Sequence, residues 1–142
     1  MSTLKTINVQ HPSASSANVT LDSSGNASVA GNLSFNSGYG SAAVAYGCRA
    51  WVNFQGTGTV TIRADGGVSS VTDDGTGAYT VNYDVALPDS NNAPVAGSNG
   101  SGIGNFGAIE VVTGTSACSV RAYRTDTNVL ADLPLICVAV FR

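Results

Sequence analysis

Hydrophobic and polar residues alternate through the middle of the sequence in three short runs, separated by breaks rich in Gly and Asp. The runs lie within Ala50–Tyr83, and their apolar members are Trp51, Val52, Phe54, Val60, Ile62, Tyr79, Val81 and Tyr83. A repeat of two is the side-chain period of a β-strand, so the segment predicts three consecutive strands with these aromatic and aliphatic side chains in a core. Turns are expected at Asp65–Gly67 and Asp73–Gly75, because Gly supplies the positive φ of tight hairpin turns.

Similar strand-sized pieces continue to the end of the chain. The expected strands lie near Ala42–Phe54, Gly58–Arg63, Val68–Thr72, Ala78–Val85, Pro94–Ala96, Gly107–Val112, Ala117–Arg124 and Leu135–Phe141. Eight short strands separated by turn residues are typical of an antiparallel β-sandwich or jelly roll, which we assign to residues 37–142. Both faces of Leu135–Phe141 are apolar, which predicts a strand that is covered on two sides. The Asn- and Gly-rich segment Asp89–Asn105 is expected to be an exposed loop.

Residues 1–36 differ from the rest of the sequence because their apolar runs are shorter, and they predict an extended N-terminal β arm. Its strand-sized pieces are separated by a Pro- and Ser-rich break and by DSSGN and AGN turns. Hairpins this short bury too little apolar surface to be stable alone, so we expect the arm to attach to a larger assembly or to another copy of the chain. The residues expected to make these assembly contacts are Leu4, Ile7, Val9, Val19, Leu21, Leu33 and Phe35.

Composition narrows the fold class and the partners. Only 11% of the 142 residues are charged, with a single Lys and a single Glu, so strong helix formers are scarce and an all-β fold is favoured. The formal charge is −3 and the arginines are scattered, which argues against nucleic acid as a partner. No apolar run is long enough to cross a bilayer and no signal-peptide pattern is present, so membrane insertion is not expected. The three cysteines, Cys48, Cys118 and Cys137, are expected to be reduced and buried.

Candidate catalytic and cofactor motifs are weak. Gly102–Gly107 matches G-x-G-x-x-G, but a dinucleotide site needs a preceding strand and a following helix, and neither is predicted. The one histidine, His11, stands before a proline in the arm, which disfavours a nucleophile–base pair. The pairs Asp73 with Asp74 and Asp84 with Asp89 are explained by turn formation. We therefore expect a non-enzymatic protein without a cofactor or metal ion.

Three stretches carry a resemblance to a known family. Trp51–Arg63 reads WVNFQGTGTVTIR and Val68–Tyr83 reads VSSVTDDGTGAYTVNY, and this run resembles a module of bacteriophage tail fibres, many of them from marine or cyanobacterial phages. The opening Ser2–Phe35 and the closing Val138–Arg142 are similar to the ends of such virion proteins. The resemblance implies a structural protein of the virion, made in the cytoplasm of the bacterial host, that forms a homotrimer.

The resemblance leaves two functions open. The first is a short trimeric tail fibre or appendage involved in host-surface attachment. The alternative is a trimeric capsid decoration (cement) protein that stabilises the head. The partners would be a tail protein or the major capsid protein and, for a fibre, a host-surface glycan or protein. The uncharged Asn91–Asn105 segment can hydrogen-bond sugar hydroxyls, so its candidate receptor-binding residues are Asn91, Asn92, Ser98, Asn99 and Ser101.

Overall fold

The computed structural model describes residues 6–35, 42–99 and 107–142. All regular elements in these ranges are β-strands, which confirms the predicted all-β class. The chain divides into two compact units, an N-terminal unit (Met1–Ala45) and a head unit (Tyr46–Arg142). The predicted functional division into a 1–36 arm and a 37–142 head stays a prediction. No helix long and apolar enough to cross a membrane occurs in the described ranges.

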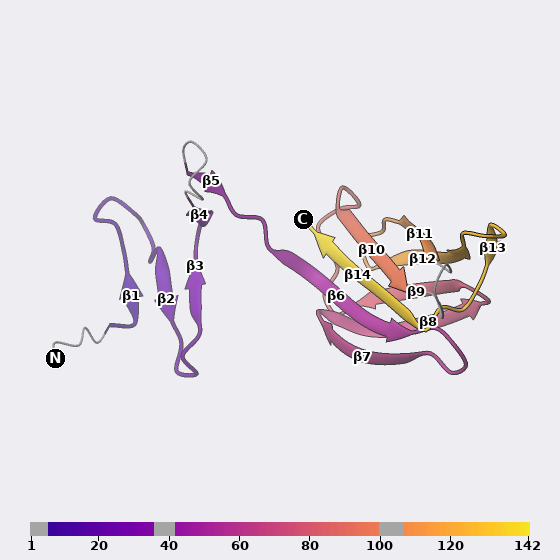
Figure 1. Cartoon of the computed structure of the whole chain (residues 1–142). Coiled ribbons are helices and arrows are strands. Elements are labelled where there is room, and N and C mark those ends of the chain that lie inside the picture. The colour runs from indigo at the N-terminus through magenta and orange to yellow at the C-terminus, as the bar shows by residue number, and fades with distance from the viewer. Residues whose placement is uncertain (1–5, 36–41, 100–106) are drawn as a thin grey trace. The chain divides into compact units, whose positions relative to one another are not determined.

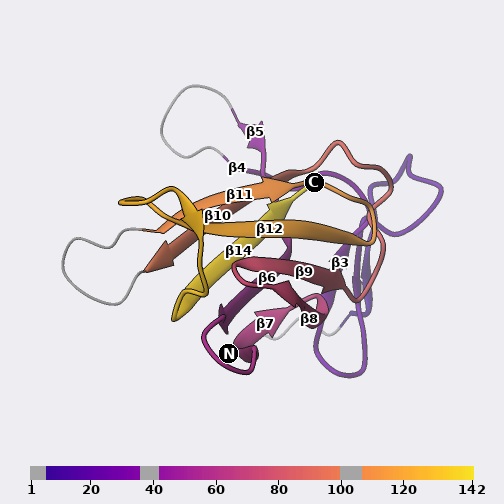
Figure 2. The ribbon, with the colours of Figure 1, turned by 90° about the vertical axis from the view of Figure 1, so that its right-hand side faces the viewer.

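The head unit is a sandwich of two antiparallel sheets (Figures 1 and 2). Sheet 1 has the strand order β10 (Ala93–Asn99), β14 (Leu135–Phe141), β6 (Cys48–Gln55) and β7 (Thr61–Gly66). Sheet 2 has the order β11 (Gly107–Val112), β12 (Ala117–Arg124), β9 (Ala78–Tyr83) and β8 (Val68–Gly75), and β13 (Val129–Leu130) pairs with β12. The predicted sandwich is thus confirmed, with each of the eight expected strands overlapping an observed one.

The core lies between the two sheets and is built by alternate residues of four strands. Its members are almost fully buried and include Ala50, Val52 and Phe54 of β6, Tyr79, Val81 and Tyr83 of β9, Cys118, Val120 and Ala122 of β12, and Ile136, Val138 and Val140 of β14. Phe54 and Tyr79 meet edge to face, with ring centroids 5.2 Å apart. This arrangement confirms the predicted core positions of Phe54, Tyr79 and Tyr83.

One end of the sandwich is closed by the segment before β14. Asp132 accepts hydrogen bonds from the Tyr79 hydroxyl (2.9 Å) and from the Gly77 amide (2.7 Å), and the Gly56 amide donates to the Leu133 carbonyl (2.9 Å). Burial, with the Asp132 carboxylate beside the ring, raises the pKa of Tyr79. The neutral Tyr79 hydroxyl therefore contacts both Asp132 and the Gly56 carbonyl of the turn after β6, while Asp132 holds the turn after β8 through Gly77.

The two turns predicted at Asp65–Gly67 and Asp73–Gly75 are observed at slightly different positions in the structure. Strand β8 continues through Asp73, Asp74 and Gly75, so the turn into β9 consists of Thr76 and Gly77. Gly77 supplies the positive φ, +65°, and its carbonyl accepts the Ala122 amide. The β7–β8 turn is made by Gly67 alone, at φ +71°, because β7 runs through Gly66.

The N-terminal unit holds a three-stranded sheet in the order β1 (Asn8–Val9), β2 (Val19–Leu21) and β3 (Ala27–Val29). The predicted DSSGN turn links β2 to β3, where Asp22 accepts the amides of Ser24 and Asn26. A separate pair is formed by β4 (Ser34–Phe35) and β5 (Ala43–Val44). The predicted short strands of this part of the chain are thus confirmed.

Candidate functional site

The sheet of the N-terminal unit has one apolar and one polar face. Val9, Val19 and Val29 lie side by side across the three strands, and Leu21 lies opposite Ala27. Asn8, Thr20 and Ser28 form the matching row on the other face. The apolar face is open, with Ile7 71%, Val9 52%, Leu21 41% and Val29 45% exposed. An exposed apolar face of this kind is accessible to a partner.

The other residues of the predicted assembly set stand apart from this sheet. Leu33 is 49% exposed beside the β4–β5 pair. Phe35 pairs with Ala43 through its backbone, and Leu4 lies outside the described residues. The assembly contact itself stays a prediction for the whole set.

The outer face of sheet 2 is polar, and we call it the polar face. It consists of side chains that point away from the core, namely Ser70, Thr72, Thr80, Asn82, Ser119 and Arg121. The Asn82 amide donates to the Ser70 and Thr72 hydroxyls, both at 3.0 Å, and Thr80 donates to Asp74 at 2.6 Å. Ser119 and Arg121 are exposed beside this network on β12. The face therefore offers hydroxyl, amide and guanidinium groups from three paired strands.

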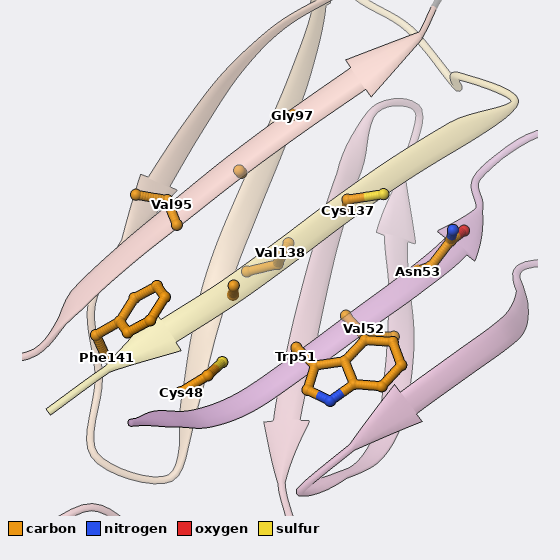
Figure 3. A pocket seen from close by; sticks show the side chains of 11 residues that line it. Cys48, Trp51, Val52, Asn53, Val95, Gly97, Cys137, Val138 and Phe141 are labelled. Carbon is orange, nitrogen blue, oxygen red and sulfur yellow. The ribbon is translucent and has the colours of Figure 1, made fainter. Parts of the chain in front are cut away.

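The outer face of sheet 1 has the opposite character and holds an apolar trough of about 660 Å³. Cys48, Trp51, Val95, Cys137 and Phe141 project from this face, as Figure 3 shows. Trp51 is 43% exposed, Val95 56% and Phe141 36%. Gly97 and Ala139 line the trough as well, and their small size leaves it open between Val95 and Trp51. We call this region the outer trough.

The position of the Trp51 ring depends on a glycine. Trp51 pairs with Gly66 of β7, and a Cβ placed at Gly66 would overlap the indole nitrogen and would lie 3.1 Å from Cδ1. The indole therefore lies over the bare backbone of β7. Trp51 was expected in the core, and this prediction is wrong because its neighbours Ala50 and Val52 point inward, so strand alternation turns the indole outward.

The cysteines also differ from expectation. Cys118 is buried as predicted, Cys137 is half-buried in the outer trough and Cys48 is exposed. Cys48 pairs with Phe141 while Ala50 pairs with Val140, so Arg49 is the extra residue of a β-bulge. The bulge shifts the alternation by one residue and turns Cys48 to the outer face, which is why the strand pattern misplaced it.

The predicted receptor-binding residues do not form one site. The expected loop is wrong for Gly97–Asn99, because strand β10 extends beyond the predicted Pro94–Ala96 and runs from Ala93 to Asn99, so Ser98 and Asn99 lie in a strand that pairs with β14 along its whole length. Asn91 stands before strand β10 and Asn99 ends it, and the strand between them is about 20 Å long at ~3.4 Å per residue. Asn92 has a structural role, since its amide donates to the Gly114 carbonyl at 3.1 Å. Ser101 lies outside the described residues, and receptor binding by this set stays a prediction.

Asp89, one of the acidic residues considered for catalysis, forms an ion pair instead. Arg142 binds Asp89 through two hydrogen bonds of 3.0 and 2.7 Å, and this guanidinium lowers the pKa of Asp89. In the described ranges, no group of three or more His, Cys, Asp or Glu side chains is placed to hold a metal ion.

Comparison with known proteins supports the fold. No family model and no curated protein matches the chain. A similar solved structure is that of the phiAB6 tailspike in complex with three-repeated oligosaccharides of Acinetobacter baumannii surface polysaccharide, with a TM-score of 0.55 and 19% identity. The match covers 96% of this chain and 30% of the tailspike chain, so the protein spans less than a third of that neighbour. At this identity the likeness concerns the fold alone.

Proposed function

We propose that the protein is a non-enzymatic structural component of a phage virion, a short homotrimeric tail appendage whose head unit contacts a glycan on the host surface. The observation that carries the proposal is the polar face of sheet 2. Hydroxyl, amide and guanidinium groups on a paired sheet can hydrogen-bond sugar hydroxyls without ordering a loop first. Support comes from the tailspike of similar fold, whose own structure holds a surface oligosaccharide.

Arg121 offers the sharpest test of the glycan contact. We expect Arg121→Ala to weaken binding of the purified protein to host surface polysaccharide about tenfold or more, because a hydrogen bond from a charged group contributes ~1.5–3 kcal/mol. Isothermal titration and competition with phage adsorption measure this loss. The matched control is Arg124→Ala on the same strand, where the guanidinium is already paired with Asp126 at 2.8 Å. Equal binding by both variants would contradict a glycan contact at the polar face.

The apolar face of the N-terminal unit supports the assembly part of the proposal. We expect Val29→Asp to lower the oligomer mass seen by light scattering, because it places a charge in a face that a partner would cover. Ser28→Asp is the matched control, since Ser28 is the preceding residue of β3 and lies on the polar side of the same sheet. If Val29→Asp and Ser28→Asp assemble alike, this face is not an assembly contact.

A further inference from the structure

Strand β11 adds a carboxylate to the outer side of sheet 2, next to the polar face. Glu110 lies directly opposite Arg121 of β12, and its neighbours Ile109 and Val111 pack against the core, so Glu110 and Arg121 project to the same outer side. Both are exposed. Tyr123 follows Arg121 by two residues on this side of β12 and is half-buried. We call Arg121, Glu110 and Tyr123 the Arg121 cluster.

The two charged groups of the Arg121 cluster are not paired with each other. Glu110 accepts a hydrogen bond from the Tyr123 hydroxyl through Oε2, at 3.1 Å. Within the part of the chain that the structure describes, the Arg121 guanidinium makes no hydrogen bond or ion pair, and Oε1 of Glu110 has no partner. The guanidinium donors and a carboxylate acceptor are therefore available side by side.

This combination of groups matches the chemistry of a sugar residue. Sugar hydroxyls both donate and accept hydrogen bonds, so they can use the donors of Arg121 and the acceptor of Glu110 together. The C–H face of a sugar ring is apolar and can pack on Tyr123, whose ring is held by the bond to Glu110. Strands β11 and β12 pair over six residue pairs, so the backbone that carries these groups is ordered before a ligand arrives.

The charge of sheet 2 decides between an uncharged and an acidic sugar. Its four long strands carry three carboxylates and two guanidiniums, on Asp73, Asp74, Glu110, Arg121 and Arg124. Arg124 is already held in an ion pair of 2.8 Å, so the carboxylates outnumber the guanidinium that remains. An acidic sugar at Arg121 would bring a negative charge next to Glu110, which offsets its attraction to the guanidinium. An uncharged sugar avoids this repulsion.

We propose that the Arg121 cluster is the part of the polar face that selects the sugar, and that it binds an uncharged sugar residue in preference to an acidic one. Arg121 donates to one sugar hydroxyl, Glu110 accepts from another, and Tyr123 packs on the C–H face of the ring. This preference rests on the glycan contact proposed above and adds the class of sugar that the protein binds.

Two matched forms of one polymer test the preference. The probe is the host surface polysaccharide, prepared once with its carboxyl groups reduced to alcohols and once with its primary hydroxyls oxidised to carboxylates. Isothermal titration with the full chain should show the uncharged form binding at least about tenfold more tightly, because like charges repel the acidic form. Salt at about 1 M screens this repulsion, so the acidic form should bind more tightly there and the ratio should fall.

Glu110→Gln distinguishes the Arg121 cluster from the total charge of the protein. The change removes one negative charge and keeps an acceptor oxygen, so binding of the acidic form should improve by about three- to tenfold and the ratio should fall. Asp65→Asn is the matched control, since it removes one negative charge from β7 of sheet 1 and should leave the ratio unchanged. Thermal melts establish that both variants are folded.

The packing of the sugar on Tyr123 has its own pair of variants. Tyr123→Phe keeps the ring and loses the bond to Glu110, whereas Tyr123→Ala loses both. We expect Tyr123→Ala to weaken binding of the uncharged form about fivefold more than Tyr123→Phe does, because the ring supplies the apolar contact. Equal losses in the two variants would overturn the ring contact.

The remaining outcomes overturn the inference in distinguishable ways. Equal binding of the two forms, or tighter binding of the acidic form, removes the preference and leaves the proposed glycan contact standing. Absence of binding to either form removes both. A ratio that Glu110→Gln and Asp65→Asn change equally would assign the preference to the total charge of the protein instead of the Arg121 cluster.

Discussion

Val138→Asp should unfold the head unit near physiological temperature. Val138 is 3% exposed and lies at the centre of β14. It pairs with Ala96 of β10 on one side and with Val52 of β6 on the other. An unpaired carboxylate at this position would lose its water without gaining a partner, so the expected loss of stability is about 4–5 kcal/mol. For a unit of this size the melting temperature should fall by roughly 15–30 °C.

Calorimetry or circular dichroism measures this change. Val129→Asp is the control, because the same substitution at a site that is 58% exposed leaves the charge in water and should shift the melt by only a few degrees. A Val138→Asp protein that melts like the wild type would show that β14 is peripheral, and the sandwich described above would then be wrong.

Gly77→Ala should be the next most damaging single substitution. Gly77 has φ +65°, and a Cβ there would lie 2.5 Å from the Ala131 amide nitrogen and 2.6 Å from the Ala122 carbonyl oxygen. These two atoms form a hydrogen bond of 3.0 Å between β12 and the segment that closes the sandwich. Because backbone would have to move and this bond would weaken, the expected loss is about 3–4 kcal/mol.

Gly58→Ala is the control that distinguishes the cost of the steric clash from the cost of the left-handed backbone conformation. Gly58 has nearly the same φ, +67°, but no atom lies within 4 Å of a Cβ placed there. Gly58→Ala should therefore cost only the left-handed conformation, about 1–2 kcal/mol. Urea titration of both variants tests the difference, and equal losses would mean that the close approach at Gly77 does not contribute.

The sequence allowed most of the fold to be predicted, because alternation of side chains depends only on strand geometry. Strands β11, β12 and β14 were predicted at their observed bounds, β12 from alternating side chains and β14 from a short run that is apolar on both faces. Composition was less informative for β10. Its Gly, Asn and Ser residues are typical of loops, yet pairing with β14 makes Ala93–Asn99 a strand. Tertiary pairing outweighed local propensity there.

The outer trough was harder to predict from the sequence. Trp51 was predicted to be in the core because of its residue type. However, Ala50, Val52 and Phe54 already occupy the inward positions of the same strand. Strict alternation would have placed the indole outside, but the bulge at Arg49 that turns Cys48 outward has no comparable signal in the pattern. The polar face does have a signal in the sequence, because Ser119 and Arg121 alternate with Cys118 and Val120 along β12.

The location of the protein on the virus particle tests the proposed tail function most directly. Electron microscopy of purified virions labelled with antibodies against the head unit, combined with densitometry of the virion proteins, gives both position and copy number. A tail appendage should give labels on the tail and a few trimers per particle, with adsorption blocked by the same antibodies. Labels spread over the capsid shell, in copy numbers that match the capsomers and without an effect on adsorption, would contradict it and identify a decoration protein.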